Sequence, residues 1–276
     1  MTELNGALRK MEASLEEPVQ YRLPVGDELL PMNDLIGSKL TLDYQGAINC
    51  CHCGRKTRKS YSQGFCYPCF TKLPQCDSCI MSPEKCHYHK GTCRDSAWGD
   101  QFCMTDHIVY LANSSGLKVG ITRASQVPTR WIDQGASQAL PFVRVSTRLQ
   151  SGLLEILFKE FVNDRTNWRA MLKGQAEPLD LKATASDLLE MNRSRIEVLQ
   201  EEHGIQAIQP LTEAEVVDIR FPVESYPTKV TSLSFDKTPV VEGVLEGIKG
   251  QYLILDTGVI NIRKHTSYNV RVSAEA

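Results

Sequence analysis

All ten cysteines of this chain fall between Cys50 and Cys103, and this clustering constrains the fold more than any other feature. Dense cysteines form disulfides in small secreted domains, whereas in a reducing compartment they usually bind metal. The first residues, MTELNGALRKMEASLEEP, contain no apolar segment typical of a secretory signal, and no apolar run is long enough to span a bilayer. We therefore expect a cytoplasmic protein without a membrane segment, whose cysteines hold metal ions.

The stretch CCHCGRKTRKSYSQGFCYPC carries two C-x2-C pairs. Each such turn presents two thiolates from one tight loop, and two turns complete the tetrahedron of soft ligands that zinc prefers. The expected ligands of this zinc are Cys50, Cys53, Cys66 and Cys69. The insert between the pairs is basic and aromatic, and we expect three of its cations to contact nucleic acid: Arg55, Lys56 and Arg58.

The stretch CDSCIMSPEKCHYHKGTC predicts a second zinc site, with Cys76, Cys79, Cys86 and Cys93 as its expected ligands. His87 and His89 compete for ligand positions, and an iron–sulfur cluster is the chemical alternative because four thiolates also suit iron. Cys51 and Cys103 are left over and are expected to be small buried residues. Closed four-ligand sites are normally structural, so both zincs are expected to fold a region too small for its own core.

Hydrophobic patterning predicts an α+β chain with helices in its middle and strands towards both ends. Residues 1–17 are expected to form a short helix or a tail. Helical spacing of apolar residues predicts a helix in SGLLEILFKEFVND, with Ser151 as its cap. A second helical stretch, PLDLKATASDLLEMNRSRIEVLQEEHG, is expected to end at Gly204.

Short β-rich runs split by Gly, Asp and Pro follow Pro210. They predict a small β-barrel, with the N-terminal strands available to complete it, and such barrels often hold nucleic acid or protein partners. The expected organisation is a β segment at 1–49, a double-zinc region at 50–104, an α/β domain at 105–174, a helical connector at 175–210 and a barrel-like domain at 211–276.

The segment HIVYLANSSGLKVGITR predicts a hairpin, and RASQVPTRWIDQGA follows it. These motifs resemble the GIY-YIG nuclease domain over roughly residues 105–170. IVY, which ends at Tyr110, stands for the first motif, and KVG, which begins at Lys118, stands for the second. The resemblance places the family's arginine at Arg130, its metal-binding glutamate at Glu155 and its asparagine at Asn167. Taken whole, the chain resembles an uncharacterised bacterial family of unknown function.

The GIY-YIG resemblance implies a nuclease in which magnesium or manganese at Glu155 assists the leaving oxygen. Tyr110 and Lys118 then act near the attacking water and the scissile phosphate, and Arg130 or Arg123 clamps that phosphate. The chain departs from the family at Lys118, where a tyrosine is usual, and at Gln134, where active members commonly carry histidine or tyrosine. Glutamine cannot act as a general base, and lysine can do so only when its pKa is lowered.

Two interpretations stay open at the level of sequence. The first is a magnesium-dependent endonuclease acting on DNA or RNA, and the second is a catalytically inactive zinc-containing module that binds nucleic acid or another protein. A net charge of −2 argues against coating nucleic acid by charge alone, so both need a local basic surface. A basic and aromatic set near the C-terminus suits single-stranded nucleic acid: Tyr252, Arg263, Lys264, His265 and Tyr268.

Overall fold

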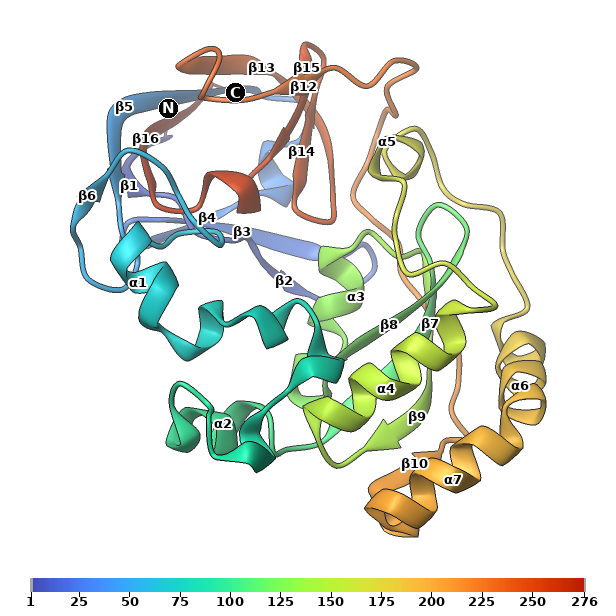
Figure 1. Ribbon diagram of the computed structural model, residues 1–276. Coiled ribbons are helices and arrows are strands. Elements are labelled where there is room, and N and C mark those ends of the chain that lie inside the picture. Colours follow the sequence, from blue (N-terminus) through green and yellow to red (C-terminus); the bar gives the residue numbers. More distant parts are fainter. Residues whose placement is uncertain (1, 276) are drawn as a thin grey trace.

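The computed structural model describes residues 2–275, which form three sheets and seven α-helices (Figure 1). The α+β class predicted from the sequence is therefore confirmed. Within this range, no helix combines the length and the apolar character that crossing a membrane requires.

The largest sheet combines strands from both ends of the sequence. Its order is β1 (Thr2–Ala7), β16 (Tyr268–Glu275), β5 (Lys39–Asn49), β13 (Val240–Lys249), β14 (Tyr252–Leu255), β15 (Gly258–Asn261) and β12 (Ser232–Leu233), with β6 (Lys56–Thr57) paired to β5. N-terminal strands thus complete the C-terminal sheet, as the sequence predicts. The predicted barrel is not confirmed, because over residues 2–275 the sheet remains open between β1 and β12.

Residues 1–17 do not form the predicted helix or tail. β1 pairs along the last strand, β16, and β2 (Glu12–Ser14) joins β3 (Gln20–Val25) and β4 (Glu28–Pro31) in a three-stranded sheet. Gly6 lets β1 cross the turn at Gly26, since a Cβ at position 6 would lie 2.4 Å from the Gly26 nitrogen. Distant partners therefore decide this segment's structure, and local patterning does not report them.

A five-stranded sheet carries the hairpin that the sequence predicts. Its order is β10 (Ile208–Pro210), β9 (Gln138–Val145), β7 (His107–Asn113) and β8 (Leu117–Arg123), with β11 (Val217–Asp218) also paired to β9. Side chains alternate along β7, so Val109 and Leu111 pack with residues of α4 (Arg148–Lys159) and α6 (Leu181–Met191). Tyr110 points to the opposite face, into the core that this sheet shares with the largest sheet.

The helices near the second sheet follow the predicted pattern with one change at a cap. α4 spans Arg148–Lys159 and begins at Thr147, whose side chain forms a capping box with Gln150. Ser151, the predicted cap, lies inside the helix and donates to the Arg148 carbonyl at 2.7 Å. The helix starts earlier because Thr147 and Gln150 satisfy two amide donors together.

The other helices include the long predicted stretch and two short elements. The predicted stretch forms two helices, α6 (Leu181–Met191) and α7 (Arg193–His203), which are divided at Asn192. α7 ends at Gly204, where φ is +97°, as predicted. Short helices are α3 (Thr129–Asp133) and α5 (Trp168–Met171). Single 3-10 turns outside the cysteine-rich region are η1 (Asn33–Leu35), η6 (Ala124–Gln126), η7 (Ile205–Ala207) and η8 (Arg263–His265).

The cysteine-rich region is a chain of short turns between the two large sheets (Figure 1). Its elements are α1 (Tyr67–Lys72), η2 (Pro74–Cys76), η3 (Ser78–Ile80), η4 (Pro83–Lys85), η5 (Tyr88–Lys90) and α2 (Ser96–Phe102). None of the three hydrophobic clusters formed by the described residues includes a residue from 50–106. The region therefore needs another source of cohesion than an apolar core.

Candidate functional site

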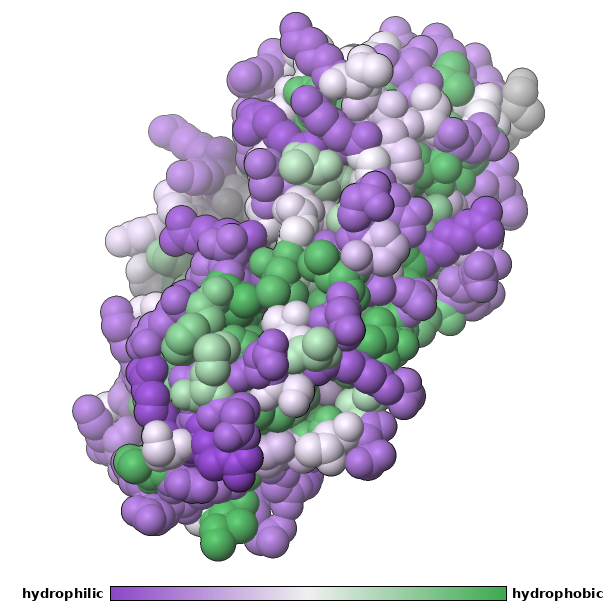
Figure 2. Space-filling view, turned by 90° about the vertical axis from the view of Figure 1, so that its right-hand side faces the viewer, coloured by the Kyte–Doolittle hydropathy of each residue, from purple (hydrophilic) through white to green (hydrophobic). Residues whose placement is uncertain are grey.

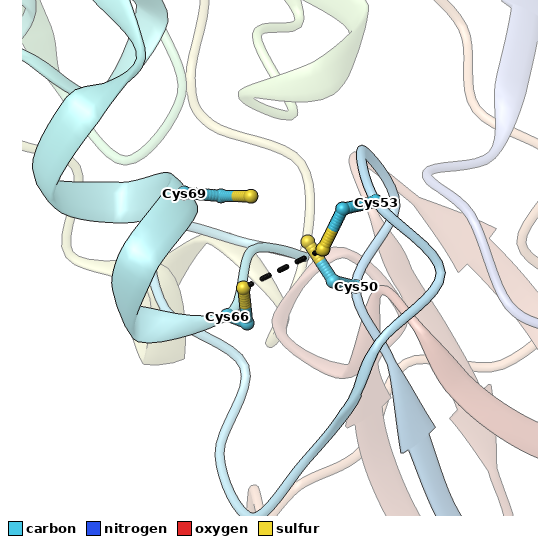
Figure 3. Close-up of side chains that lie close together, drawn as sticks. All are labelled: Cys50, Cys53, Cys66 and Cys69. Carbon is cyan, nitrogen blue, oxygen red and sulfur yellow. Dashed lines mark hydrogen bonds between the residues drawn. The ribbon is translucent and has the colours of Figure 1, made fainter.

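Four cysteines converge where β5 runs into the cysteine-rich region. The thiols of Cys50, Cys53, Cys66 and Cys69 lie within 4.8 Å of one another and point towards a common centre (Figure 3). Cys50 follows β5, Cys53 lies in the next turn, and Cys66 and Cys69 lie at the start of α1. Gly54, at a φ of +70°, closes the first turn with an amide that donates to the Cys50 carbonyl at 2.9 Å. This is the first cluster predicted from the C-x2-C spacing.

The geometry of this cluster fits zinc. Tetrahedral zinc with Zn–S bonds of about 2.3 Å separates its sulfurs by about 3.8 Å, and the Cys53 and Cys66 sulfurs are 3.7 Å apart. Burial opposes ionisation of Cys50, but hydrogen bonds from the Cys53, Cys66 and His52 amides lower the pKa of its thiol to about 6. The cluster can therefore hold a zinc ion, with at least one thiolate formed at neutral pH.

Further cysteines surround a small cavity among the later turns. The cavity has a volume of about 10 Å³, and its lining includes Cys79, Cys86, Cys93 and Cys103 together with Asp77 and His87. Ligand atoms of Asp77, Cys79 and His87 lie within 4.8 Å of one another. Cys103, which the C-x2-C spacing assigns to neither zinc site, thus lines the cavity. The sequence did not indicate this, because Cys103 lies far along the chain from the other cysteines.

Cys76 belongs to other surroundings. It is not among the residues that line the cavity. Burial raises the pKa of its thiol, and the neighbouring Ser62 hydroxyl opposes this rise. Three of the four residues expected at the second zinc site, Cys79, Cys86 and Cys93, therefore line the same cavity. Cys76 does not, and its thiol neighbours Ser62.

Tyr110 and Lys118 share one hydrogen-bond acceptor on the inner face of the hairpin. The Tyr110 hydroxyl donates to Oε1 of Gln134 at 2.9 Å, and the Lys118 ammonium donates to the same oxygen. The Tyr110 ring lies over Gly120, its cross-strand partner, where a Cβ would lie 2.7 Å from the ring. Gly120 is therefore required for the position of Tyr110.

Arg130 and Glu155 complete what we call the Tyr110 cluster, which consists of Tyr110, Lys118, Arg130, Gln134 and Glu155. Burial and the Arg130 charge lower the pKa of Lys118 to about 8, and Glu155 opposes them. Burial raises the pKa of Tyr110 to about 12, with Arg130 lowering and Glu155 raising it. The charges of Arg130 and Glu155 thus act on both Tyr110 and Lys118, so residues from β7, β8, α3 and α4 lie near one another here.

An acidic residue that the sequence analysis missed lies beside this cluster. The Val119 amide donates to the Asn163 carbonyl at 2.8 Å, which holds the segment after α4 against β8. The next residue, Asp164, raises the pKa of Lys118 and pairs with Lys159 at 2.8 Å. Burial raises the pKa of Glu155, with Asp164 adding to the rise and Lys159 opposing it. No motif marks Asp164, because a long-range backbone contact places it.

A family model described as "Protein of unknown function (DUF2797)" matches residues 37–270. The chain belongs to this family. The DUF2797 match begins after β4 and includes both cysteine groups and the Tyr110 cluster. A search of curated proteins and a search of solved structures gave no match.

Two residues within the DUF2797 match lie apart from the Tyr110 cluster. The Asn167 side chain accepts from the Ala170 amide at 3.2 Å and caps α5. The Arg123 guanidinium lies over the Phe102 ring, 4.8 Å from its centroid, at the edge of the cysteine-rich region. The structure thus gives Asn167 a structural contact and places Arg123 beside α2.

The basic residues of the DUF2797 chain divide into an exposed group and a buried one. Arg55, Lys56 and Arg58 are exposed around β6, and no ion pair among residues 2–275 engages them. Burial and Arg130 lower the pKa of Arg263, whose guanidinium donates to Gln63. Arg263 therefore adds a cation to the side of the cluster that carries Arg130.

The aromatic residues expected near the C-terminus are occupied by packing. Tyr252 stacks on Trp168 with a centroid separation of 5.6 Å, and Tyr268 lies against Tyr44 at 5.1 Å. His265 is buried, and both of its ring nitrogens form hydrogen bonds, one with the Ser234 hydroxyl and one with the Asn261 carbonyl. This arrangement offers no free aromatic platform from these residues, so the cations Arg263 and Lys264 remain the groups available to a phosphate.

A larger hollow lies elsewhere in the DUF2797 fold. A cavity of about 490 Å³ runs between α6, α7 and β9, and its apolar lining includes Leu140, Phe142, Leu189, Ile196 and Leu211. Figure 2 shows the face that carries α6 and α7, where apolar side chains gather among charged ones. No residue of the Tyr110 cluster lines this cavity. The larger cavity and the Tyr110 cluster are therefore separate places, and burial shifts the pKa values of Tyr110 and Lys118 in the cluster.

Proposed function

We propose that this DUF2797 protein is a metal-dependent endonuclease that hydrolyses phosphodiester bonds in DNA or RNA. One observation carries the proposal. Tyr110 and Lys118 share the Gln134 oxygen, with Arg130 and Glu155 close enough to shift both pKa values. Buried acid–base groups with perturbed pKa values and specific charged partners are typical of catalytic sites. The GIY-YIG resemblance names these same residues.

Lys118 is the residue we assign as general base. Its pKa of about 8 leaves a usable neutral fraction at physiological pH, so its amine can accept a proton from an attacking water. Tyr110 has a pKa of about 12 and stays protonated, so its hydroxyl donates rather than accepts. Tyr110 therefore serves to position Gln134 and the water, and the substitution of lysine for the family's usual tyrosine keeps a base at the site.

Arg130 supplies positive charge for the scissile phosphate, and Arg263 adds a second guanidinium nearby. A planar guanidinium can donate two parallel hydrogen bonds to phosphate oxygens, and this fixes the orientation of the reacting group. Both side chains are only partly exposed, which strengthens their attraction for a phosphate relative to a fully solvated pair.

Glu155 and Asp164 are the residues that would hold magnesium or manganese. Carboxylate oxygens suit these hard cations. Burial raises the pKa of Glu155, and the charge of Asp164 adds to the rise. When bound, such an ion supplies positive charge at the leaving oxygen. The Cys50, Cys53, Cys66 and Cys69 cluster has four protein ligands and no open position, so we give its zinc a structural role.

The alternative function is a binding module without catalysis, and one observation favours it. Tyr110 and Lys118 are buried, with 0% and 4% of their surfaces exposed, so neither group faces bulk water in this conformation. The exposed cations Arg55, Lys56 and Arg58 would then contact nucleic acid or an acidic protein surface.

The test is cleavage of labelled single-stranded DNA, branched DNA and structured RNA by purified protein with Mg²⁺ or Mn²⁺. We expect cutting that Glu155→Gln abolishes. Glu160→Gln is the matched control, because Glu160 lies at the end of the same helix, is exposed and pairs only with Arg195. Cutting that survives Glu155→Gln would exclude this site. Salt-sensitive binding without any cutting would replace the proposal with the binding module.

A further inference from the structure

The turns between Pro74 and Cys103 have no apolar core of their own and are held by a few polar contacts and by packing of η4 on α4. No residue from 50–106 joins a hydrophobic cluster of the described residues, and the first cysteine cluster reaches only to Cys69 in α1. Four 3-10 turns of three residues each and the short helix α2 follow. Segments this short do not persist without packing or a cross-link. A second cross-link would join the turns that these few contacts leave unconnected.

Each of four cysteines stands in or just after one of these short elements. Cys79 lies in η3, Cys86 follows η4, Cys93 comes after η5, and Cys103 follows α2. All four line the same cavity of about 10 Å³. A space of that size accommodates about one water-sized sphere. It suits a single ion and is too small for an iron–sulfur cluster.

We propose that Cys79, Cys86, Cys93 and Cys103 form a second zinc site, in which Cys103 takes the place that sequence spacing gives to Cys76. Four thiolates are a complete ligand set for structural zinc. The ion would join η3, η4, the turn after η5 and the end of α2 at one point. This replaces the missing apolar core with metal–sulfur bonds.

Asp77 and His87 also line the cavity, but each is engaged by a neighbour. The Arg94 guanidinium contacts the Asp77 carboxylate at 2.8 Å and also donates to the Leu73 carbonyl at 3.0 Å. The His87 ring lies 2.8 Å from the Thr92 hydroxyl through Nδ1 and 3.6 Å from Asp77 through Nε2. The ligand atoms of both side chains lie within 4.8 Å of the Cys79 thiol, and we assign them as supports that orient this metal ligand.

The site also lies at the start of the helix that carries Glu155. The Cys103 carbonyl accepts from the Arg148 amide at 2.8 Å, and the Arg148 side chain donates to the Ile80 carbonyl at 2.6 Å. Both contacts join the turns around the proposed ion to the first residue of α4. The ion would therefore fix the base of α4 in addition to the turns.

The test compares zinc content in the full chain and in single variants after exhaustive dialysis. We expect two zincs per chain in the unaltered protein, one in Cys103→Ser, and two in both Cys76→Ser and His87→Ala. Cys76→Ser is the matched control, because Cys76 is buried in the same segment but does not line the cavity. One zinc in the unaltered chain, or loss of zinc from Cys76→Ser or His87→Ala but not from Cys103→Ser, would overturn the assignment. Iron in place of zinc would do the same.

A second measurement covers the case in which Cys103→Ser does not fold. Cys103→His keeps a metal-binding atom at this position, and cobalt(II) can replace zinc in the full chain. With eight thiolates bound, exchange of one for imidazole should lower the thiolate-to-cobalt absorbance by about one eighth. Cys76→His should leave it unchanged. Equal absorbance for Cys103→His and the unaltered chain contradicts the proposed ligand set.

Discussion

Gly152 of α4 lies directly against the backbone of Glu84 in η4. A Cβ at position 152 would come within 2.4 Å of the Glu84 nitrogen and 2.7 Å of the Pro83 carbonyl carbon. Backbone atoms cannot swing aside as the end of a long side chain can. The helix that carries Glu155 is therefore in close contact with the cysteine-rich region at a point that admits only glycine.

Gly152→Ala should lower the free energy of unfolding by about 2 kcal/mol. Overpacking costs about 3 kcal/mol at a site this tight, and the higher helix propensity of alanine returns about 1 kcal/mol. Denaturant unfolding measures the change. Gly174→Ala is the control, since a Cβ there meets nothing within 4 Å. A more stable Gly152→Ala protein would mean that helix propensity alone governs this position.

Lys118→Met should raise stability at neutral pH by about 2 kcal/mol. The pKa of Lys118 falls from its ordinary 10.5 to about 8 in the folded chain, so burial of its charge costs on the order of 3 kcal/mol, partly offset by its hydrogen bond to Gln134. The folded chain binds fewer protons than the unfolded chain between these two values. The gain should therefore be complete below pH 8, shrink as pH rises, and vanish above about 10.5. A gain that is constant from pH 7 to 10.5 would contradict the lowered pKa.

If the protein cleaves nucleic acid, its rate should follow the neutral form of Lys118. The rate should rise about tenfold per pH unit below pH 8 and level off above that value, where the amine is mostly deprotonated. Lys118→Met should lose at least about 100-fold in rate. Lys182→Met, which removes an exposed lysine on α6 that pairs with Glu215, should keep both the rate and the profile. Single-turnover cleavage between pH 6 and 10 checks this, and a flat profile would exclude Lys118 as the base.

Cys69→Ser should release one zinc and destabilise the start of the cysteine-rich region. Loss of one of four thiolates opens the site, and metal binding contributes folding free energy where no core exists. We expect a fall in melting temperature and faster proteolysis within residues 50–72. Cys51→Ser is the control, because Cys51 adjoins Cys50 but lies outside the four-thiol cluster. Zinc content that is unchanged in Cys69→Ser would remove this cysteine from the ligand set.

Sequence patterns predicted the features that depend on neighbouring residues. The C-x2-C spacing identified the Cys50 cluster because both residues of each pair lie in one turn. Gly204 marked the end of α7 because a positive φ is a local requirement. The resemblance to GIY-YIG nucleases named Tyr110 and Lys118, whose side chains share the Gln134 oxygen.

Features that depend on distant contacts were not visible in the sequence. Cys103 reaches its cavity only because α2 folds back onto the earlier turns, and Asp164 reaches Lys118 only through the pairing of Asn163 with β8. β1 is polar and lacks a clear apolar alternation, and its pairing with β16 makes it a strand. These three cases share one cause, which is that the deciding partner lies far away along the chain.

The position of β5 has a consequence for synthesis on the ribosome. Asp43 in β5 faces Val240 on one edge and Arg271 on the other, so both partner strands are made long after β5 itself. At about 5–20 residues per second, translation leaves this strand without them for on the order of ten seconds or more. Unpaired strand edges are templates for aggregation. A nascent chain of this family therefore depends on protection of its first sheet strands until translation is nearly complete, and a message that stops early yields an aggregation-prone fragment.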